Sequence, residues 1–244
     1  MNYKAVLQYD GTRYRGWQTQ GNTDNTIQGK LETLLTKMAG KPVEVNGSGR
    51  TDAGVHAAGQ VISFRCKTKE LPEEICRYMN EYLPEDIAVL TVEEAAPRFH
   101  ARLNAVRKTY VYRIWNAPVR NVFRRRFTTW IQKPLDLDAM EQAATLLCGT
   151  HDYRAFCSLK KFKKSTVRTI EKIEIGKMGQ EIRISYTGDG FLYHMVRILT
   201  GTLVEVGLGL RKPEEMTEIL EGQDRTKAGR LMPPEGLTLE SVEY

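Results

Sequence analysis

The sequence, 244 residues long, contains no long hydrophobic run. No segment approaches the roughly 18 consecutive apolar residues that a membrane-spanning helix needs. The first residues, MNYKAVLQYDG, also lack the basic, apolar and small-residue order of a signal peptide. Neither membrane insertion nor secretion is therefore indicated, and we expect a cytoplasmic protein.

Cysteine and histidine are also scarce, with four residues of each. The cysteines are scattered along the chain without a C-x-x-C pair: Cys66, Cys76, Cys148 and Cys157. No histidine lies near them at the spacing of a zinc site, and the histidines are themselves dispersed. We therefore expect reduced thiols, and the sequence gives no support for a bound metal.

Acidic residues are fewer than basic ones, 30 against 36, which gives a formal net charge of +6. A basic protein suits a polyanionic partner, although net charge alone discriminates poorly. The distribution of the charges is more informative. Residues 120–127 (RNVFRRRF) and 159–164 (LKKFKK) place cations beside aromatic rings, as does YDGTRYRGW near the start. This composition suits phosphate contacts and base stacking, so it favours an RNA partner over solvated loops.

Residues 47–64, GSGRTDAGVHAAGQVISF, carry most of the functional information. Alternating apolar residues on either side predict two strands, with residues 47–59 as a tight connection between them. One carboxylate, Asp52, lies there among glycines and close to Arg50. Glycines let the backbone approach a ligand, and an arginine within a few ångströms favours the ionised carboxylate. Asp52 is thus either a poised anion or the closing residue of a turn, and residue types alone leave both open.

The apolar pattern of the first hundred residues predicts the order strand, helix, two strands, helix, strand. The expected strands are residues 3–9, 43–45, 61–64 and 87–92, and the expected helices are residues 27–38 and 73–82. Asn25 or Thr26 is expected to begin the first helix and Gly40 to end it. This is the ferredoxin-like order, which RNA-binding sheet domains also use.

The rest of the chain repeats this plan loosely. The expected strands are residues 109–115, 128–131, 167–175, 181–186 and 237–242, and the expected helices are residues 137–147, 193–206 and 214–220. Asp136 is the expected cap of the helix that follows it. The pattern therefore predicts an α+β chain of two halves, residues 1–100 with the Asp52 loop and residues 101–244.

Two further residues of the second half stand out. Tyr110 belongs to the predicted strand KTYVYRI, in which Tyr110 and Tyr112 point to the same face. Tyrosines on a strand are more often core than catalytic, and core is the expectation for Tyr112. Arg197 interrupts the apolar pattern of the helix at residues 193–206, and a charge that approaches a core needs a partner.

These residues coincide with the motifs of a known family. GRTDAGVHA (residues 49–57), followed by Gly59 and Gln60, closely resembles the catalytic motif of the tRNA pseudouridine synthase A family. YDGTRYRGWQTQ (residues 9–20) resembles its amino-terminal signature and RKTYVYRIWN (residues 107–116) its central tyrosine strand. GFLYHMVRILTGTLVEVG (residues 190–207) resembles its carboxy-terminal helix. Four landmarks in the right order extend the resemblance over the whole chain.

The resemblance implies an enzyme that converts uridine to pseudouridine in the anticodon arm of tRNA, at the positions conventionally numbered 38, 39 and 40. It also implies two ferredoxin-like, RRM-like halves joined through one extended mixed β-sheet, with an RNA cleft between them, and a homodimer. Asp52 matches the family's catalytic nucleophile, and Tyr110 matches the tyrosine that stacks on the target base. Arg197 matches the arginine that pairs with the catalytic aspartate, and Arg50 is expected to fill the space that the flipped base leaves or to hold a phosphate. The chemistry needs neither a metal nor a redox cofactor.

Residues 157–164 (CSLKKFKK) depart from the family, because they are more basic than its sequence at the edge of the RNA cleft. A paralogue that acts on a different RNA, such as rRNA, is therefore an alternative. A non-catalytic RNA-binding module is another, although the intact Asp52, Arg50 and Tyr110 argue against it. A glycoside hydrolase usually pairs two carboxylates around the bond, and the loop at residues 47–59 supplies one.

Overall fold

A computed structural model describes all residues from Met1 to Tyr244, with five α-helices and ten β-strands. The strands pair in both parallel and antiparallel fashion, so the expected α+β class with mixed pairing is confirmed. The chain divides into two compact units: Met1–Val106 with Thr238–Tyr244, and Arg107–Leu237. None of the helices is both long and apolar enough to span a membrane.

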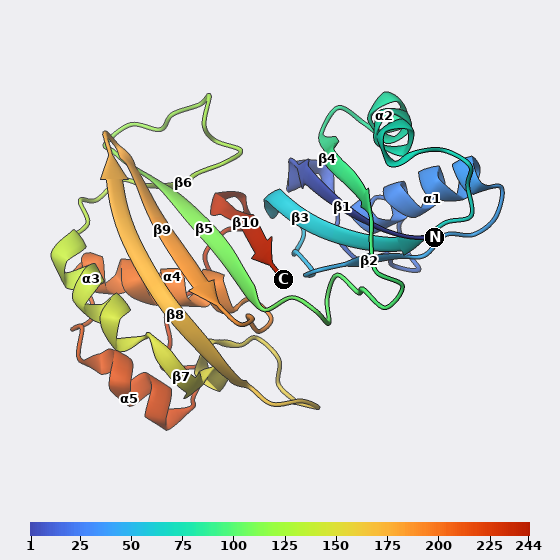
Figure 1. Ribbon diagram of the computed structural model, residues 1–244. Helices are drawn as coiled ribbons and strands as arrows, with labels where there is room; N and C mark the ends of the chain where they lie inside the picture. Colours follow the sequence, from blue (N-terminus) through green and yellow to red (C-terminus); the bar gives the residue numbers. More distant parts are fainter. The chain divides into compact units, whose positions relative to one another are not determined.

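The first unit has the order β-α-β-β-α-β that the sequence predicts, and the last strand of the chain joins it (Figure 1). Its elements are β1 (Asn2–Tyr9), α1 (Ile27–Ala39), β2 (Val45–Gly47), β3 (His56–Arg65), α2 (Pro72–Tyr82), β4 (Ile87–Glu94) and β10 (Leu237–Glu243). The strands lie in the order β4-β1-β3-β10, and β2 pairs with β3. All these pairs are antiparallel except β3 with β10, which is parallel.

Local capping fixes the first helix. The Thr26 side chain accepts a hydrogen bond from the Gly29 amide, as an N-cap residue does. At the other end Gly40 has a φ of 67°, the left-handed conformation in which helices commonly stop. Leu31 and Leu35 are fully buried on one face of α1, so the predicted helix and both of its ends are confirmed.

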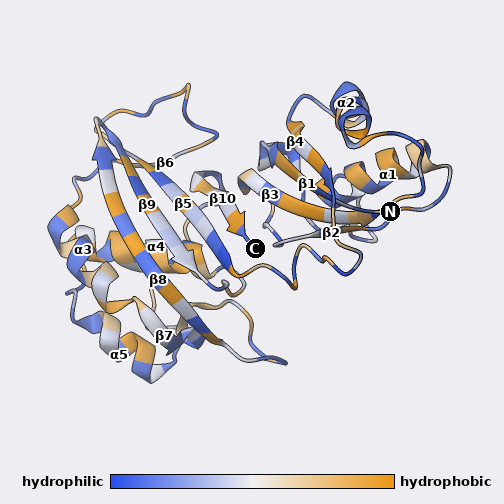
Figure 2. Ribbon diagram, in the orientation of Figure 1, coloured by the Kyte–Doolittle hydropathy of each residue, from blue (hydrophilic) through white to orange (hydrophobic).

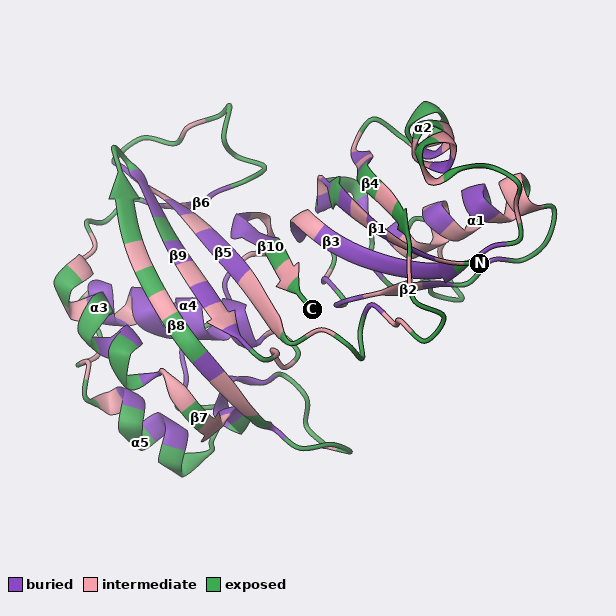
Figure 3. Ribbon diagram, viewed as in Figure 1, coloured by how far each residue is buried: buried purple, intermediate pink, exposed green.

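The connection that contains Asp52 is shorter than the sequence predicts. Strand β3 already begins at His56, so only residues 48–55 form the loop, and Gly59 lies inside the strand. A Cβ at Gly59 would come within 2.5 Å of the Glu240 carbonyl oxygen, so the glycine lets the backbones of β3 and β10 approach closely. Figure 3 shows most of β3 as buried.

The second unit consists of β5 (Arg107–Asn116), β6 (Thr129–Ile131), α3 (Leu137–Leu146), β7 (Gly149–Asp152), β8 (Val167–Met178), β9 (Glu181–Gly188), α4 (Met195–Gly207) and α5 (Glu215–Gly222). Its strands lie in the order β5-β9-β8-β7, with β6 parallel to β5. Helices α3 and α4 pack against one face of these strands (Figure 1). Every residue of α4 except Glu205 is buried, whereas β8 alternates between hydrophobic and hydrophilic residues (Figure 2).

Three details of the second half differ from the sequence prediction. The turn between β8 and β9 is only two residues long, with Gly179 at a φ of 61°, because both strands run further than expected. Strand β7 was not predicted, since its residues, GTHD, show no apolar alternation. The expected halves are residues 1–100 and 101–244, whereas the first observed unit extends to Val106 and includes Thr238–Tyr244, because Thr238 and Leu239 pair with His56 and Ala57 of β3.

Candidate functional site

Asp52 lies in the loop of residues 48–55, between β2 and β3 of the first unit. The loop turns through backbone groups, because the Val55 amide donates to the Asp52 carbonyl oxygen at 3.1 Å and Gly54 has a φ of 80°. Thr51 is buried, Asp52 is half-buried and Arg50 is exposed. The loop thus holds the backbone of Asp52 while leaving part of its side chain accessible.

A buried polar network lies beneath this loop. The Ser48 hydroxyl donates to Gln60 Oε1 at 2.6 Å, and Gln60 Nε2 donates to the Gly49 carbonyl oxygen at 2.9 Å. The hydroxyls of Tyr9 and Thr51 are 2.8 Å apart. Burial raises the pKa of Tyr9 to about 12, so its phenol stays neutral at physiological pH. Ser48 and Gln60 are fully buried, so the network fixes the residues on either side of Arg50 without burying a charge.

The amino-terminal signature packs against the same loop. A Cβ at Gly11 would come within 2.0 Å of the Val55 carbonyl oxygen, and one at Gly16 within 2.9 Å of the Thr51 carbonyl oxygen. The Trp17 amide donates to that Thr51 oxygen at 3.0 Å. Glycine is therefore required where the segment crosses the loop, and this part of YDGTRYRGW holds the Asp52 backbone in place.

His56, at the start of β3, ties the signature to the strand. Its Nδ1 accepts a hydrogen bond from the Gly11 amide at 3.1 Å and lies 3.2 Å from Asp10 Oδ1. The imidazole is buried, so it is part of the packing that supports the loop. His56, four residues after Asp52 in the motif, is thus a structural contact of the amino-terminal signature.

Arg50 lies two residues before Asp52 and makes no ion pair with it. The Arg50 side chain is exposed and makes no hydrogen bond or salt bridge. An arginine that folding leaves unpaired is available to a phosphate or another anionic ligand. Arg50 and Asp52 therefore share one loop, with different surroundings.

In the second unit, Tyr110 lies on β5 opposite Tyr186 of β9. It is buried, and its ring meets the edge of Phe191 with the centroids 5.2 Å apart. Tyr112, two residues further along, is fully buried, and its hydroxyl contacts the Thr129 hydroxyl at 2.6 Å and the Pro233 carbonyl oxygen at 2.7 Å. Burial raises the pKa of Tyr112. The prediction that Tyr112 is a core residue is confirmed.

Arg197 lies in the first turns of α4, one of the most buried helices of the chain. Its exposed fraction is 8%, and its Nε donates to the Met232 carbonyl oxygen at 2.7 Å. The Met232 amide donates back to the Arg197 carbonyl oxygen at 3.3 Å. A Cβ at Gly201 would come within 1.9 Å of the Arg230 carbonyl oxygen, so α4 and the segment after α5 approach closely. The need for a partner, which the sequence predicts, is met in part by this carbonyl.

The two basic runs lie in loops of the second unit. In residues 120–127, Phe123 has 92% of its surface exposed, while Arg124 pairs with the buried Glu181. Burial raises the pKa of Glu181, but hydrogen bonds from Arg183 and Arg124 outweigh it and hold the pKa below its ordinary value. In residues 159–164 the lysines are exposed, and Phe162 lies under the Arg154 guanidinium at 5.4 Å. The lysines of this run therefore face solvent, while its aromatic ring turns back to the protein.

Sequence reasoning identified the loop but missed the residues that hold it. Tyr9, Ser48, Thr51 and Gln60 form the supporting network, and none of them was expected to have that role. Gln60 carried a usable signal, because a polar side chain beside the apolar Val61 and Ile62 in a buried strand needs a hydrogen-bond partner.

Comparison with known proteins agrees with the motifs. The family model of tRNA pseudouridine synthases matches residues 5–104 and 143–244. The tRNA pseudouridine synthase A of Bacillus sp. (strain KSM-64) is 48% identical over 243 residues, which cover 100% of this chain and 99% of that protein. The tRNA pseudouridine synthase A of Brevibacillus brevis is 47% identical over 242 residues, 99% and 98% of the two chains. The tRNA pseudouridine synthase A 2 of Bacillus anthracis is 45% identical over 243 residues, with coverage of 100% and 99%.

Proposed function

The chain belongs to the tRNA pseudouridine synthase family, and we propose that Asp52 is the nucleophile with which it isomerises uridine in the anticodon stem-loop of tRNA. The target uridines are those conventionally numbered 38, 39 and 40. The activity itself, isomerisation of uridine to pseudouridine in tRNA, is that of the family. One observation supports the assignment of the residue. Asp52 is the carboxylate of a loop whose backbone is held by the buried hydrogen bonds of Ser48 and Gln60, and the Asp52 side chain is half-buried.

The reaction breaks the bond between N1 of uracil and C1′ of ribose, rotates the base and joins C5 to C1′. The C5 proton leaves and a ring nitrogen gains a proton, so no atom is lost and no oxidant or reductant is consumed. A carboxylate such as Asp52 can form a covalent intermediate and divide this change into easier steps. The target nucleotide must leave its stack to reach the loop, at a cost of about a few kcal/mol.

The other candidate residues have roles that fit their surroundings. Arg50 is exposed and makes no ion pair, which suits a residue that binds a phosphate or fills the space left by the flipped base. Tyr110 offers an aromatic ring for stacking on the target base, and Arg197 is a substrate-site residue, both by the family resemblance. The same resemblance supports a homodimer that works in the cytoplasm without a metal or other cofactor.

The test is pseudouridine formation in unmodified tRNA transcripts, mapped by carbodiimide-dependent stops in primer extension. We expect stops at positions 38–40 with the native protein. Asp52→Asn should lower turnover by about 1000-fold or more, because it removes the nucleophile, while tRNA affinity stays within about twofold since phosphate contacts dominate it. Asp24→Asn, at an exposed carboxylate that makes no hydrogen bond or salt bridge, is the matched control and should leave turnover unchanged.

The alternatives give different results in this assay. Stops at other positions, or in rRNA only, would mean a paralogue with another target. Tight tRNA binding without any stops would mean a non-catalytic RNA-binding module. Substantial turnover by a folded Asp52→Asn variant would refute the role of Asp52.

A further inference from the structure

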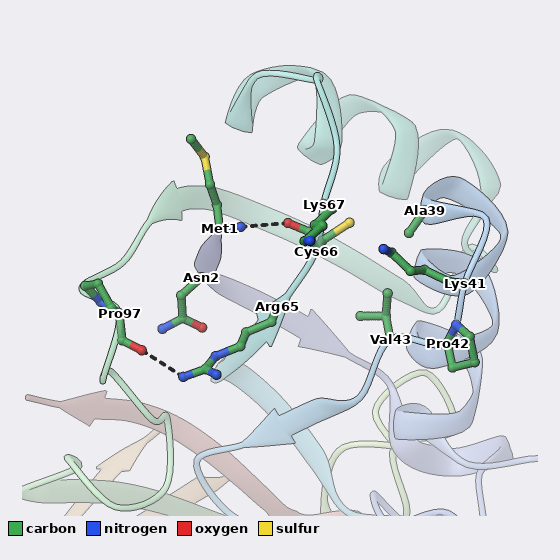
Figure 4. Close-up of a pocket in the computed structure, with 10 residues that line it drawn as sticks. All are labelled: Met1, Asn2, Ala39, Lys41, Pro42, Val43, Arg65, Cys66, Lys67 and Pro97. Carbon is green, nitrogen blue, oxygen red and sulfur yellow. Dashed lines mark hydrogen bonds between the residues drawn. The ribbon is translucent and has the colours of Figure 1, made fainter.

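A cavity of about 480 Å³ lies in the first unit, at the end of β3 that is remote from the Asp52 loop. Figure 4 shows its ten lining residues, which come from the start of β1, the end of α1 and the segment after it, the end of β3 and the two residues after it, and the segment after β4. Three of them carry cationic side chains, Lys41, Arg65 and Lys67, and none is acidic. The cavity is therefore a concentration of positive charge without a carboxylate in its wall.

The three cations differ in how they are held. Arg65 Nη2 donates to the Pro97 carbonyl oxygen at 2.9 Å, which fixes the guanidinium at the rim (Figure 4). Lys41 follows the left-handed Gly40 at the end of α1, and its side chain points toward Lys67 and Cys66. Neither lysine makes a hydrogen bond or a salt bridge. Like charges that approach one another repel, so an anion between them would stabilise the arrangement.

The rest of the wall is mainly apolar. Ala39, Pro42, Val43, the buried Cys66 and Pro97 form most of it, and they offer a surface against which a flat ring can pack. The polar Asn2 and Met1, whose amino group donates to the Cys66 carbonyl oxygen at 2.9 Å, complete it. The volume lies within the range of about 300 to 1,000 Å³ that small-molecule sites occupy. We propose that this cavity binds a nucleotide, with its phosphate held by Lys41, Arg65 and Lys67 and its base against the apolar wall.

This site is separate from the Asp52 loop. The ten residues of β3 run from His56, next to the loop, to Arg65 at the cavity, a length of about 30 Å at 3.3 Å per residue. One flipped uridine does not cover that distance. The nucleotide is therefore either a further nucleotide of the bound RNA, which rests on the proposed function, or a free nucleotide.

The experiment compares two double variants of equal charge. Lys41→Gln with Lys67→Gln removes both unpaired cations of the cavity, and Lys30→Gln with Lys69→Gln removes two charges of the same unit that do not line it. Arg65 is left in place because it holds Pro97. For each protein, tRNA affinity is measured against salt concentration, and the melting temperature is measured with AMP and with adenosine. AMP is the probe because a uracil ring would also be drawn to the catalytic loop.

If the nucleotide belongs to the RNA, the cavity variant should lower the slope of log K against log salt by at least about 0.7 relative to the control variant. If it is free, AMP but not adenosine should raise the melting temperature of the native protein and the control variant, but not of the cavity variant. Either result supports the site and identifies its source. Equal salt slopes together with no AMP effect specific to the cavity would overturn it. Both readouts are binding measurements, so an inactive Asp52 loop would not disturb them.

Discussion

The Asp52 loop of the first unit and helix α4 of the second, which carries Arg197, share one kind of close backbone contact but bury their candidate site residues to different extents. In each, a glycine packs closely against a backbone carbonyl oxygen: Gly11 against that of Val55, and Gly201 against that of Arg230. Around Asp52 the support comes from backbone groups and a neutral hydrogen-bond network, and the carboxylate stays half-buried. Tyr110 and Arg197, by contrast, are each 8% exposed.

The difference determines what a substitution tests. The backbone of the Asp52 loop is held by its neighbours, and Asp52→Asn keeps the shape of the side chain, so we expect this variant to leave the packing of the loop in place. The side chains of Tyr110 and Arg197 are themselves packed, so removing either also creates a cavity or leaves a buried polar group without its partner. Conservative substitutions are therefore informative at Tyr110, and truncations are not.

The largest effect is expected where the close contact between a glycine and a backbone carbonyl oxygen is broken. Gly11→Ala and Gly201→Ala each place a methyl group against a backbone carbonyl, at 2.0 Å and 1.9 Å, so chain segments must move apart. We expect each to lower the free energy of unfolding by about 1 to 3 kcal/mol, as overpacked cores do, measured by urea titration. Gly11→Ala should also lower turnover, because it displaces the Asp52 loop.

Gly176→Ala is the matched control, since a Cβ there would meet nothing within 4 Å. It should be close to neutral. If Gly11→Ala behaved like this control in stability and turnover, the close approach of the signature would not be what positions Asp52.

Local sequence signals predicted most of the elements. Thr26, Gly40 and Asp136 were identified as helix boundaries because capping depends on residues adjacent in sequence, and each side chain or φ angle has the expected geometry. The Asp52 loop was identified because its glycines and polar residues interrupt two apolar runs. The short length of the loop was not predicted, because β3 already begins at His56 through its pairing with two distant strands, β1 and β10.

Contacts between distant residues account for what the sequence did not predict. The return of β10 to the first unit depends on pairing with β3, far earlier in the chain, which no periodicity encodes. The buried network under Asp52 joins Tyr9, Ser48 and Gln60, which come from three segments. The unpaired state of Arg50 likewise depends on which way the loop turns, and neighbouring positions in sequence do not fix that.

A smaller effect is expected at Tyr110, and it is best measured against Tyr112, the buried tyrosine two residues further along the same strand. Tyr110→Phe keeps the ring against Phe191 and removes the hydroxyl. tRNA affinity should survive, and single-turnover pseudouridine formation should fall by roughly tenfold or more if the hydroxyl takes part in proton transfer. Tyr112→Phe should show the opposite pattern, a loss of about 1 to 2 kcal/mol of stability from its two hydrogen bonds with normal turnover of the folded protein. Unchanged turnover in Tyr110→Phe would leave stacking as the only role for this residue.

The smallest effect is expected in the basic loop of residues 159–164, which lacks both the glycine contacts and the buried network of the Asp52 loop. Its lysines are exposed and make no salt bridge, so their removal should not change stability. The test variant replaces four residues by Gln: Lys160, Lys161, Lys163 and Lys164. If they bind tRNA phosphates, each lost contact should reduce the slope of log K against log salt by roughly 0.7 to 0.9.

The control variant for this loop removes four exposed charges elsewhere in the same unit: Lys133, Lys177, Lys212 and Lys227. Lysine contacts to phosphate position an RNA without reading its bases, so the loss of affinity should be uniform across tRNAs and rRNA fragments. A variant that loses one RNA while keeping another would instead make this loop the element that selects the target. A salt slope equal to that of the control variant would show that the lysines are solvated and away from the RNA, because only charges that displace counterions contribute to the slope.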